Sequence, residues 1–238
     1  MDRMLLVGAC LQIPLPSQSY GHIATFYDLM NYAAKGDEEY LDVVHWTLDV
    51  LRASDVVRRY SAHEELERHL AAGVSAWTAT ETGLVRRVDP TAQASFVQAT
   101  SPGDQSSTEL RDAWGAAYGR NPNASDAWDH AIKAAEAVLI PIVVPTQSGA
   151  HMGHVIGQLD HQGARWSTLL RFNQTTTPVN PPTTAVQALV GILRLLYPNP
   201  DRHVGPDHRV PTLEEARAVV QLAVTIVQWA RDGQIARR

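Results

Sequence analysis

Apolar residues recur at three- and four-residue steps along most of this chain, a spacing that places them on one face of a helix. In the N-terminal half the pattern predicts helices over 20–34 and 38–52. A mostly charged stretch over 61–71 predicts a third helix that lies on the surface, and a short helix is expected over 91–99. The first part of the chain is therefore expected to be largely helical.

A short hairpin is expected between these helices. β-favouring residues over 75–80 and 84–88 flank the turn Glu81-Thr82-Gly83, which contains a glycine. Because two strands alone are only marginally stable, the hairpin is expected to pack against the helices.

The C-terminal half has longer apolar stripes. They predict helices near 108–118, from Ser125 to about Leu139, after Gly149, from Thr184 and from about Leu213. The last of these has a clear start signal, because Thr212 and Glu215 can form a capping box in which each side chain accepts a hydrogen bond from the other residue's backbone N–H. This half is expected to form a helical bundle.

The segment from Thr100 to Ser107 is rich in serine and contains proline and glycine, which is typical of a linker. We therefore expect two domains, a small helical module with a short β-hairpin over 1–104 and a helical bundle over 105–238. The fold class is predicted to be mainly α.

Charge is spread unevenly along the chain, whose formal net charge is −5. Residues 1–105 contain 8 Lys/Arg against 14 Asp/Glu, whereas 106–238 contain 12 against 11. An acidic surface repels nucleic acid, so a polyanion would bind only at a local basic patch in the second half. Lys35 and Lys133 are the only lysines. Guanidinium groups thus supply most of the positive charge, which suits forked recognition of phosphate and also follows from codon usage in a GC-rich genome.

Cys10 is the only cysteine, which excludes an internal disulfide or a thiolate metal site and fits a reducing compartment. The apolar run before Cys10 is too short for a signal peptide, and no run approaches the ~18 residues that a membrane span needs. A cytoplasmic protein without membrane contact is expected. No Walker loop or dinucleotide fingerprint is present, so no cofactor is expected.

The most unusual stretch is the charged segment Asp201–Arg209, which holds two arginines, two histidines and two aspartates directly before the capped last helix. Gly205 and Pro206 keep it from being a helix interior, so a loop is predicted. Backbone N–H groups at a helix N-terminus favour anions, and Arg202 and Arg209 add positive charge there. The charged segment is therefore a candidate anion-binding site.

A resemblance to a known family is carried by four stretches: Ala117-Tyr118-Gly119-Arg120-Asn121-Pro122-Asn123-Ala124-Ser125-Asp126-Ala127, Ala131-Ile132-Lys133-Ala134-Ala135-Glu136-Ala137, Asp201-Arg202-His203-Val204-Gly205 and the helix Glu215–Trp229. Over roughly residues 108–235 the chain resembles the C-terminal domain of the bacterial abortive-infection family, a branch of the HEPN superfamily of helical-bundle domains. The resemblance implies a HEPN-like bundle over 105–238 and a sensing or regulatory role for 1–104.

HEPN ribonucleases have an arginine, a polar residue and a histidine four to six residues after the arginine, at the start of the last long helix. Arg202, His203 and His208 match this pattern and are the implied catalytic residues. The family stretch runs Arg-His-Gly, whereas Val204 intervenes here and Pro206 keeps the motif outside the helix. Either His203 or His208 is therefore the functional histidine.

Three further residues are candidates for binding the substrate. Many HEPN domains have an acidic or polar residue on the first bundle helix that faces the motif, and Glu136 corresponds to it by position. Arg209 and Asp201 lie within the charged segment itself.

The activity that the resemblance implies is metal-independent cleavage of RNA, in which the 2′-OH attacks the adjacent phosphate. A histidine can transfer protons near pH 7, and an arginine can stabilise charge on the phosphoryl oxygens. HEPN enzymes pair the last helices of two subunits, so RNA and a homodimer are the expected partners. The setting would be phage defence or a toxin system, with an antitoxin or a phage-derived protein as a further partner.

Other interpretations of the same residues stay open. The bundle could be a non-catalytic module for dimerisation and protein interaction. The charged segment could be a polar connector in which Asp201 and Asp207 neutralise the arginines. His151, His154 and His161 could bind zinc together with a histidine of the charged segment, although no H-E-x-x-H pattern supports a metal site and none is expected.

Overall fold

The structure is a computed structural model that describes residues 3–11, 21–52, 62–80, 83–170, 184–201 and 209–238. The chain divides into two compact units. Unit 1 comprises residues 1–87 with Tyr118–Asn121, and unit 2 comprises Val88–Ala117 with 122–238. The division between Arg87 and Val88 differs from the predicted boundary at 104/105, and the two domains stay a prediction.

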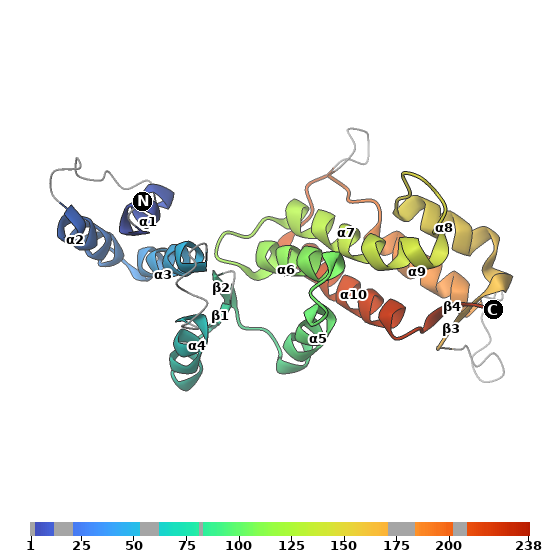
Figure 1. Ribbon diagram of the computed structural model, residues 1–238, viewed down its shortest axis with the longest axis horizontal. Helices are drawn as coiled ribbons and strands as arrows, with labels where there is room; N and C mark the ends of the chain where they lie inside the picture. The colour runs from blue at the N-terminus through green and yellow to red at the C-terminus, as the bar shows by residue number, and fades with distance from the viewer. Residues whose placement is uncertain (1–2, 12–20, 53–61, 81–82, 171–183, 202–208) are drawn as a thin grey trace. The chain divides into compact units, whose positions relative to one another are not determined.

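Unit 1 consists of four helices and a two-stranded antiparallel hairpin in its described part (Figure 1). The elements are α1 (Arg3–Cys10), α2 (Gly21–Ala33), α3 (Asp37–Arg52), α4 (Ala62–Ala72), β1 (Trp77–Thr80) and β2 (Gly83–Arg86). The predicted helices and hairpin are present. The eight-residue helix α1 was not predicted, because its apolar residues form one short run without a period.

The hairpin packs on α3 through a small core of Leu48, Ala79 and Leu84. Gly83 has a φ of +117°, and a Cβ built there would lie 2.5 Å from Nδ1 of His45. Nδ1 of His45 accepts a hydrogen bond from the backbone N–H of Leu84 at 3.2 Å. Glycine is therefore needed at this position both for its backbone conformation and for the close approach of the imidazole.

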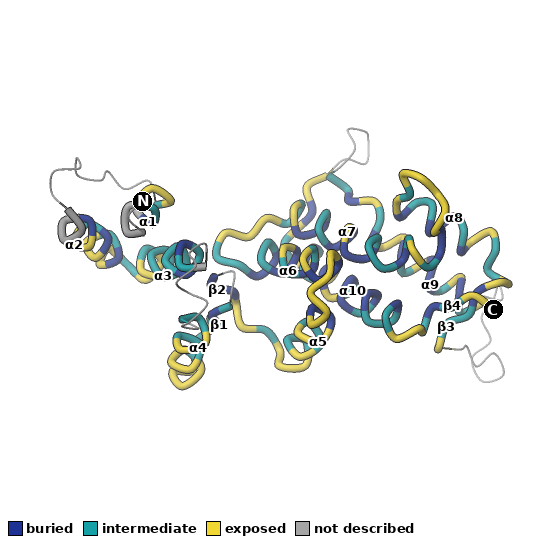
Figure 2. Tube along the Cα trace, viewed as in Figure 1, coloured by how far each residue is buried: buried dark blue, intermediate teal, exposed yellow. Residues whose placement is uncertain are grey.

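Helix α4 has no buried residue and is largely exposed in Figure 2, as the charged pattern predicted. The carboxylate of Glu67 connects it to the hairpin, because Oε2 accepts hydrogen bonds from the hydroxyl of Thr78 at 2.6 Å and the N–H of Ala79 at 2.9 Å. Arg87 forms an ion pair with the other oxygen at 2.9 Å.

Unit 2 is the helical bundle. Its elements are α5 (Pro90–Thr100), α6 (Gln105–Tyr118), α7 (Ala124–Val143), α8 (Met152–His161), β3 (Trp166–Thr168), α9 (Ala185–Leu196), α10 (Leu213–Arg231) and β4 (Ile235–Arg237). Among the described residues, α7 and α10 make the most extensive contact between elements, and α5, α8 and α9 pack around this pair. Figure 2 shows buried residues along α7 and α10, where small side chains such as Ala131, Ala135, Ala216 and Ala223 allow close packing.

Two features of unit 2 differ from the sequence prediction. Helix α6 begins at Gln105, inside the segment that was interpreted as a linker, because Asp104 accepts hydrogen bonds from the N–H and the hydroxyl of Ser107, both at 2.9 Å. Strands β3 and β4 pair antiparallel, with Trp166 opposite Arg237, and each has only three residues. A strand this short shows no alternation that sequence analysis can recognise.

The mainly α fold class is confirmed. Within the ranges that the structure describes, no helix is both long and apolar enough to cross a membrane.

Candidate functional site

The connection from α9 to α10, which includes the charged segment, is fixed to α7 at the point where it leaves α9. The indole N–H of Trp128 on α7 donates to the backbone carbonyl of Leu196, the last residue of α9, at 2.7 Å. Both residues are buried. The end of α9 therefore has a defined position on the surface of α7.

Asn199 makes a second connection to α7, two residues before the charged segment. Its side chain is 1 % exposed. Its amide nitrogen lies within donor distance of the Ser125 carbonyl (3.1 Å), the Ser125 hydroxyl (3.2 Å) and a carboxylate oxygen of Asp129 (3.0 Å). Its amide oxygen accepts from the N–H of Asp201 at 3.1 Å. Asn199 thereby fixes the backbone of the first residue of the charged segment.

The two ends of the charged segment lie side by side. The backbone N–H of Arg209 donates to the carbonyl of Pro200 at 3.3 Å. Pro200 and Arg209 are therefore neighbours, next to the start of α10.

Arg209 is fixed to the first turn of α10 by Glu215. The two guanidinium nitrogens lie 2.7 and 2.8 Å from the two carboxylate oxygens, a bidentate pair. Glu215 also accepts from the N–H of Thr212 at 2.8 Å, and the Thr212 hydroxyl accepts from the N–H of Glu215 at 3.2 Å, which confirms the predicted capping box. The Arg209 guanidinium and the Thr212 N–H together lower the pKa of Glu215 to about 2.

The three implied catalytic residues, Arg202, His203 and His208, lie outside the described residues. Asp207, which a polar connector would use to neutralise an arginine, lies outside them as well.

The substrate-binding candidates that the structure describes do not all lie in one place. Asp201 and Arg209 come together at the base of the charged segment. Glu136 does not join them. It is half-buried on α7, and its carboxylate accepts from the N–H of Met152 at 2.7 Å, which stabilises the start of α8.

His151 and His154 form the capping box of α8. Nδ1 of His151 accepts from the N–H of Gly153 at 3.1 Å, and Nδ1 of His154 accepts from the N–H of His151 at 3.2 Å. The hydroxyl of Tyr197 lies 3.4 Å from the same Nδ1 of His151. His161 bonds to the carbonyl of Gly157 in its own helix at 2.7 Å. Each of these three histidines thus has a structural partner at Nδ1, and in the described part of the chain they do not form a group of metal ligands.

The described groups at the base of the charged segment are more acidic than basic. Among the described residues here, Asp129 accepts from Asn199, and the guanidinium of Arg209 is paired with Glu215. A phosphate at this place would therefore need a further cation, and Arg202 is the arginine that the sequence supplies next to Asp201.

Asn199 was not recognised from the sequence. The only feature of the neighbouring sequence that marks Asn199 is its place between Pro198 and Pro200. Its partners Ser125 and Asp129 lie 74 and 70 positions earlier in the chain. Comparisons of the chain with protein-family models, with curated proteins and with solved structures give no match.

Proposed function

We propose that this protein is a metal-independent endoribonuclease of a bacterial phage-defence or toxin system, acting as a homodimer. The observation that supports the proposal most directly is the closed base of the charged segment. A segment of mixed arginine and histidine that begins and ends at one place beside a helix N-terminus can present its side chains together.

The proposed reaction has balanced proton transfers. One imidazole, of His203 or His208, accepts the proton of the RNA 2′-OH as its oxygen attacks the adjacent phosphorus. The bond from phosphorus to the 5′-oxygen breaks, and that oxygen takes a proton from a second imidazole. The products are a 2′,3′-cyclic phosphate and a 5′-OH end. Arg202 stabilises the negative charge on the phosphoryl oxygens.

The experiment is RNA cleavage by the purified full chain in buffer with a metal chelator. Wild type is compared with Arg202→Ala, His203→Ala and His208→Ala. Loss of one catalytic group is expected to lower the rate by at least about 100-fold. Arg194→Ala is the matched control, because Arg194 forms an exposed ion pair with Asp160 on α8 at 2.8 Å. Circular dichroism checks that each variant is folded.

The proposal is abandoned if wild type does not cleave RNA, or if Arg202→Ala and both histidine variants cleave at the wild-type rate. The dimer is tested separately by light scattering after size-exclusion chromatography. If the protein is a monomer at the concentration of the cleavage assay, the proposed homodimer is excluded.

A second candidate function is a non-catalytic module for dimerisation and protein interaction. The bidentate pair of Arg209 with Glu215 favours it, because this pair removes one of the two arginines of the charged segment from contact with an anion. A folded protein that forms dimers and neither binds nor cleaves RNA would support this alternative.

A further inference from the structure

A second group of titratable side chains lies between α6 and α7, away from the charged segment. Oε2 of Glu109 lies 2.6 Å from Nδ1 of His130. On the other side of the same ring, Nε2 lies 3.6 Å from Oδ1 of Asp126. Asp112 follows Glu109 by three positions on α6, so both carboxylates are on one face of that helix. One ligand atom each from Glu109, Asp112 and His130 lies within 4.8 Å of the others.

Among the residues that the structure describes, no basic side chain balances the negative charge of this group. In the described part of the chain, no lysine or arginine forms an ion pair with Glu109, Asp112 or Asp126. Arg111, which stands between the two α6 carboxylates in sequence, donates instead to the carbonyl of Thr100 at 2.8 Å. Three carboxylates therefore surround one imidazole, which supplies at most one positive charge.

The pair of Glu109 and His130 is partly shielded from water, whereas Asp112 and Asp126 are exposed. The side chains of Glu109 and His130 are 19 % and 21 % exposed. Repulsion between charges is stronger in such a place than at the open surface, and so is the attraction of a cation. A divalent cation would compensate the carboxylates better than a single proton does.

We propose that Glu109, Asp112 and His130 bind a divalent transition-metal ion of the zinc type. One imidazole nitrogen with carboxylate oxygens suits zinc and its neighbours, whereas magnesium and calcium prefer oxygen ligands alone. Nδ1 of His130 is the nitrogen that ligates the ion, because it already faces Glu109. Binding displaces the Nδ1 proton, which is released to solvent.

A metal-bound histidine usually donates its other ring N–H to a carboxylate, and Asp126 is the carboxylate nearest to Nε2 of His130, at 3.6 Å. A small rotation of the exposed Asp126 side chain would bring it within hydrogen-bond distance, where it would fix the ring orientation and make the ligating nitrogen more basic. Two ligands on a tetrahedral zinc ion are about 3.3 Å apart, so Glu109 must rotate outward by somewhat more than half an ångström from its present 2.6 Å contact. Its side chain has three rotatable bonds and can do so.

The ion would join α6 to α7. These helices are already connected by the buried hydroxyl of Ser106, which donates to the carbonyl of Ala134 at 2.9 Å. A metal bound only by the folded state raises its stability in proportion to the logarithm of the free metal concentration. The site is thus structural, and it is independent of the proposed RNA cleavage, which needs no metal.

The test uses the full chain, stripped with a chelator and dialysed. Zinc is titrated in competition with a chromophoric chelator, and the number of equivalents bound is compared between wild type, His130→Gln and Glu109→Gln. Each variant is expected to bind one equivalent less, or to bind it at least about 10-fold more weakly. Asp126→Asn is expected to keep the equivalent with an affinity roughly 10-fold lower.

His154→Gln is the matched control, because it removes another half-exposed histidine of unit 2 that serves as a helix cap. It should leave this equivalent in place. Equal zinc binding by wild type, His130→Gln and Glu109→Gln would overturn the site. So would loss of the same equivalent in His154→Gln alone.

A second readout keeps the test valid if a variant folds poorly. Asp112 is exposed, so Asp112→Asn should fold normally and still weaken zinc binding. Zinc should raise the melting temperature of wild type and raise that of Asp112→Asn less. An equal rise in both would contradict the role of Asp112 as a ligand. Because RNA cleavage is assayed in chelator, failure of either proposal leaves the other unaffected.

Discussion

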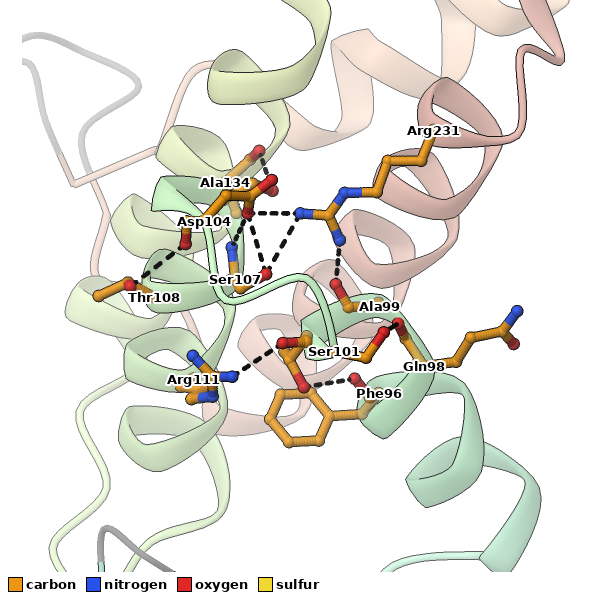
Figure 3. Close-up of polar contacts among 12 residues, drawn as sticks. Phe96, Gln98, Ala99, Ser101, Asp104, Ser107, Thr108, Arg111, Ala134 and Arg231 are labelled. Atoms are coloured by element: carbon orange, nitrogen blue, oxygen red, sulfur yellow. Dashed lines mark hydrogen bonds and ion pairs between the residues drawn. The ribbon is translucent and has the colours of Figure 1, made fainter.

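Arg231 near the end of α10 and Asp104 before α6 form an ion pair, with 2.6 Å between Nη2 and Oδ1 (Figure 3). The same carboxylate oxygen accepts from Ser107, and the other guanidinium nitrogen of Arg231 donates to the carbonyl of Ala99 in the last turn of α5. One guanidinium therefore connects the end of α5, the start of α6 and the end of α10.

Replacing Arg231 by methionine is expected to lower the free energy of unfolding of unit 2 by about 2 kcal/mol, since charged hydrogen bonds to a carbonyl and a carboxylate are lost. Arg194→Met, which removes a more exposed ion pair, should cost less than about 1 kcal/mol. Urea unfolding of both variants measures the difference. Equal effects would show that the junction adds nothing beyond an ordinary surface pair.

The same junction gives a pH dependence. Burial disfavours the charged form of Asp104, but hydrogen bonds from Ser107 and Arg231 outweigh it and lower the pKa of this carboxyl. A lowered pKa means that the contribution to stability is present above the ordinary carboxyl pKa and is lost as the pH falls below it. Asp104→Asn should therefore flatten the acid limb of the stability curve of unit 2.

In unit 1, His45 gives a pH dependence near neutrality. Burial lowers the pKa of His45 despite the nearby charges of Asp49 and Asp42, because the charged imidazole is poorly solvated there. The neutral form accepts from the N–H of Leu84. The resulting stability is complete above an ordinary histidine pKa of about 6.5 and is lost as the pH falls through that value.

Hydrogen exchange of the Leu84 amide tests this expectation. Its protection, corrected for the intrinsic exchange rate, should fall between pH 7.5 and pH 5.5, values chosen to lie about one unit on each side of 6.5. His45→Ala should already show low protection at the higher pH. The same pH response in wild type and His45→Ala would exclude His45 as the cause.

Asn199 should be sensitive to a change of a single atom. Asn199→Asp replaces the donor to Ser125 by an acceptor and puts a carboxylate 3.0 Å from that of Asp129. A loss of about 3 kcal/mol is expected, as for other unpaired buried charges. If RNA cleavage depends on the fixed base of the charged segment, activity should fall in the same variant.

Asn123→Asp is the matched control for Asn199→Asp. Asn123 is the N-cap of α7, and its side chain accepts from the N–H of Asp126 at 3.1 Å. Aspartate fills an N-cap as well as asparagine does, so this variant should change stability by less than about 0.5 kcal/mol. Thermal and urea unfolding of both variants measure the two losses of stability. A large loss in both would point to general intolerance of charge on this side of α7.

Glu215→Gln tests whether Arg209 contributes to RNA binding. Glutamine can still complete the capping box, but the bidentate pair with Arg209 is lost. A freed guanidinium should lower the dissociation constant for a 2′-O-methyl RNA by roughly two- to five-fold, the value of an exposed ion pair. Glu214→Gln changes a neighbouring exposed carboxylate that does not bond to Arg209 and is the control. Equal affinities of both variants for the RNA would show that Arg209 does not contribute to RNA binding.

Features that neighbouring residues determine are predictable from the sequence. The capping box of Thr212 and Glu215 needs residues only three positions apart, and the apolar stripes of α3, α7 and α10 repeat within one turn. The predicted start of α6 near residue 108 is a few residues late, because a serine-rich stretch after Asp104 is typical of a linker, whereas Ser107 caps the helix with Asp104.

Contacts between distant residues could not be predicted in this way. Asn199 needs Ser125 and Asp129, His130 needs Glu109 from another helix, and β3 needs β4 from the end of the chain. None of these pairs leaves a periodic signal in the sequence. Arg202, His203 and His208 stay predictions of the sequence alone.

The contact between Pro200 and Arg209 makes residues 202–208 a replaceable insert. Because its two ends already meet, the entropy of loop closure grows only slowly with length, by about 0.6 kcal/mol for each doubling. A glycine and serine stretch of equal or greater length would close on the same two residues and leave the core of α7 and α10 unchanged. The bundle is thus a scaffold onto which other sequences could be grafted between positions 201 and 209.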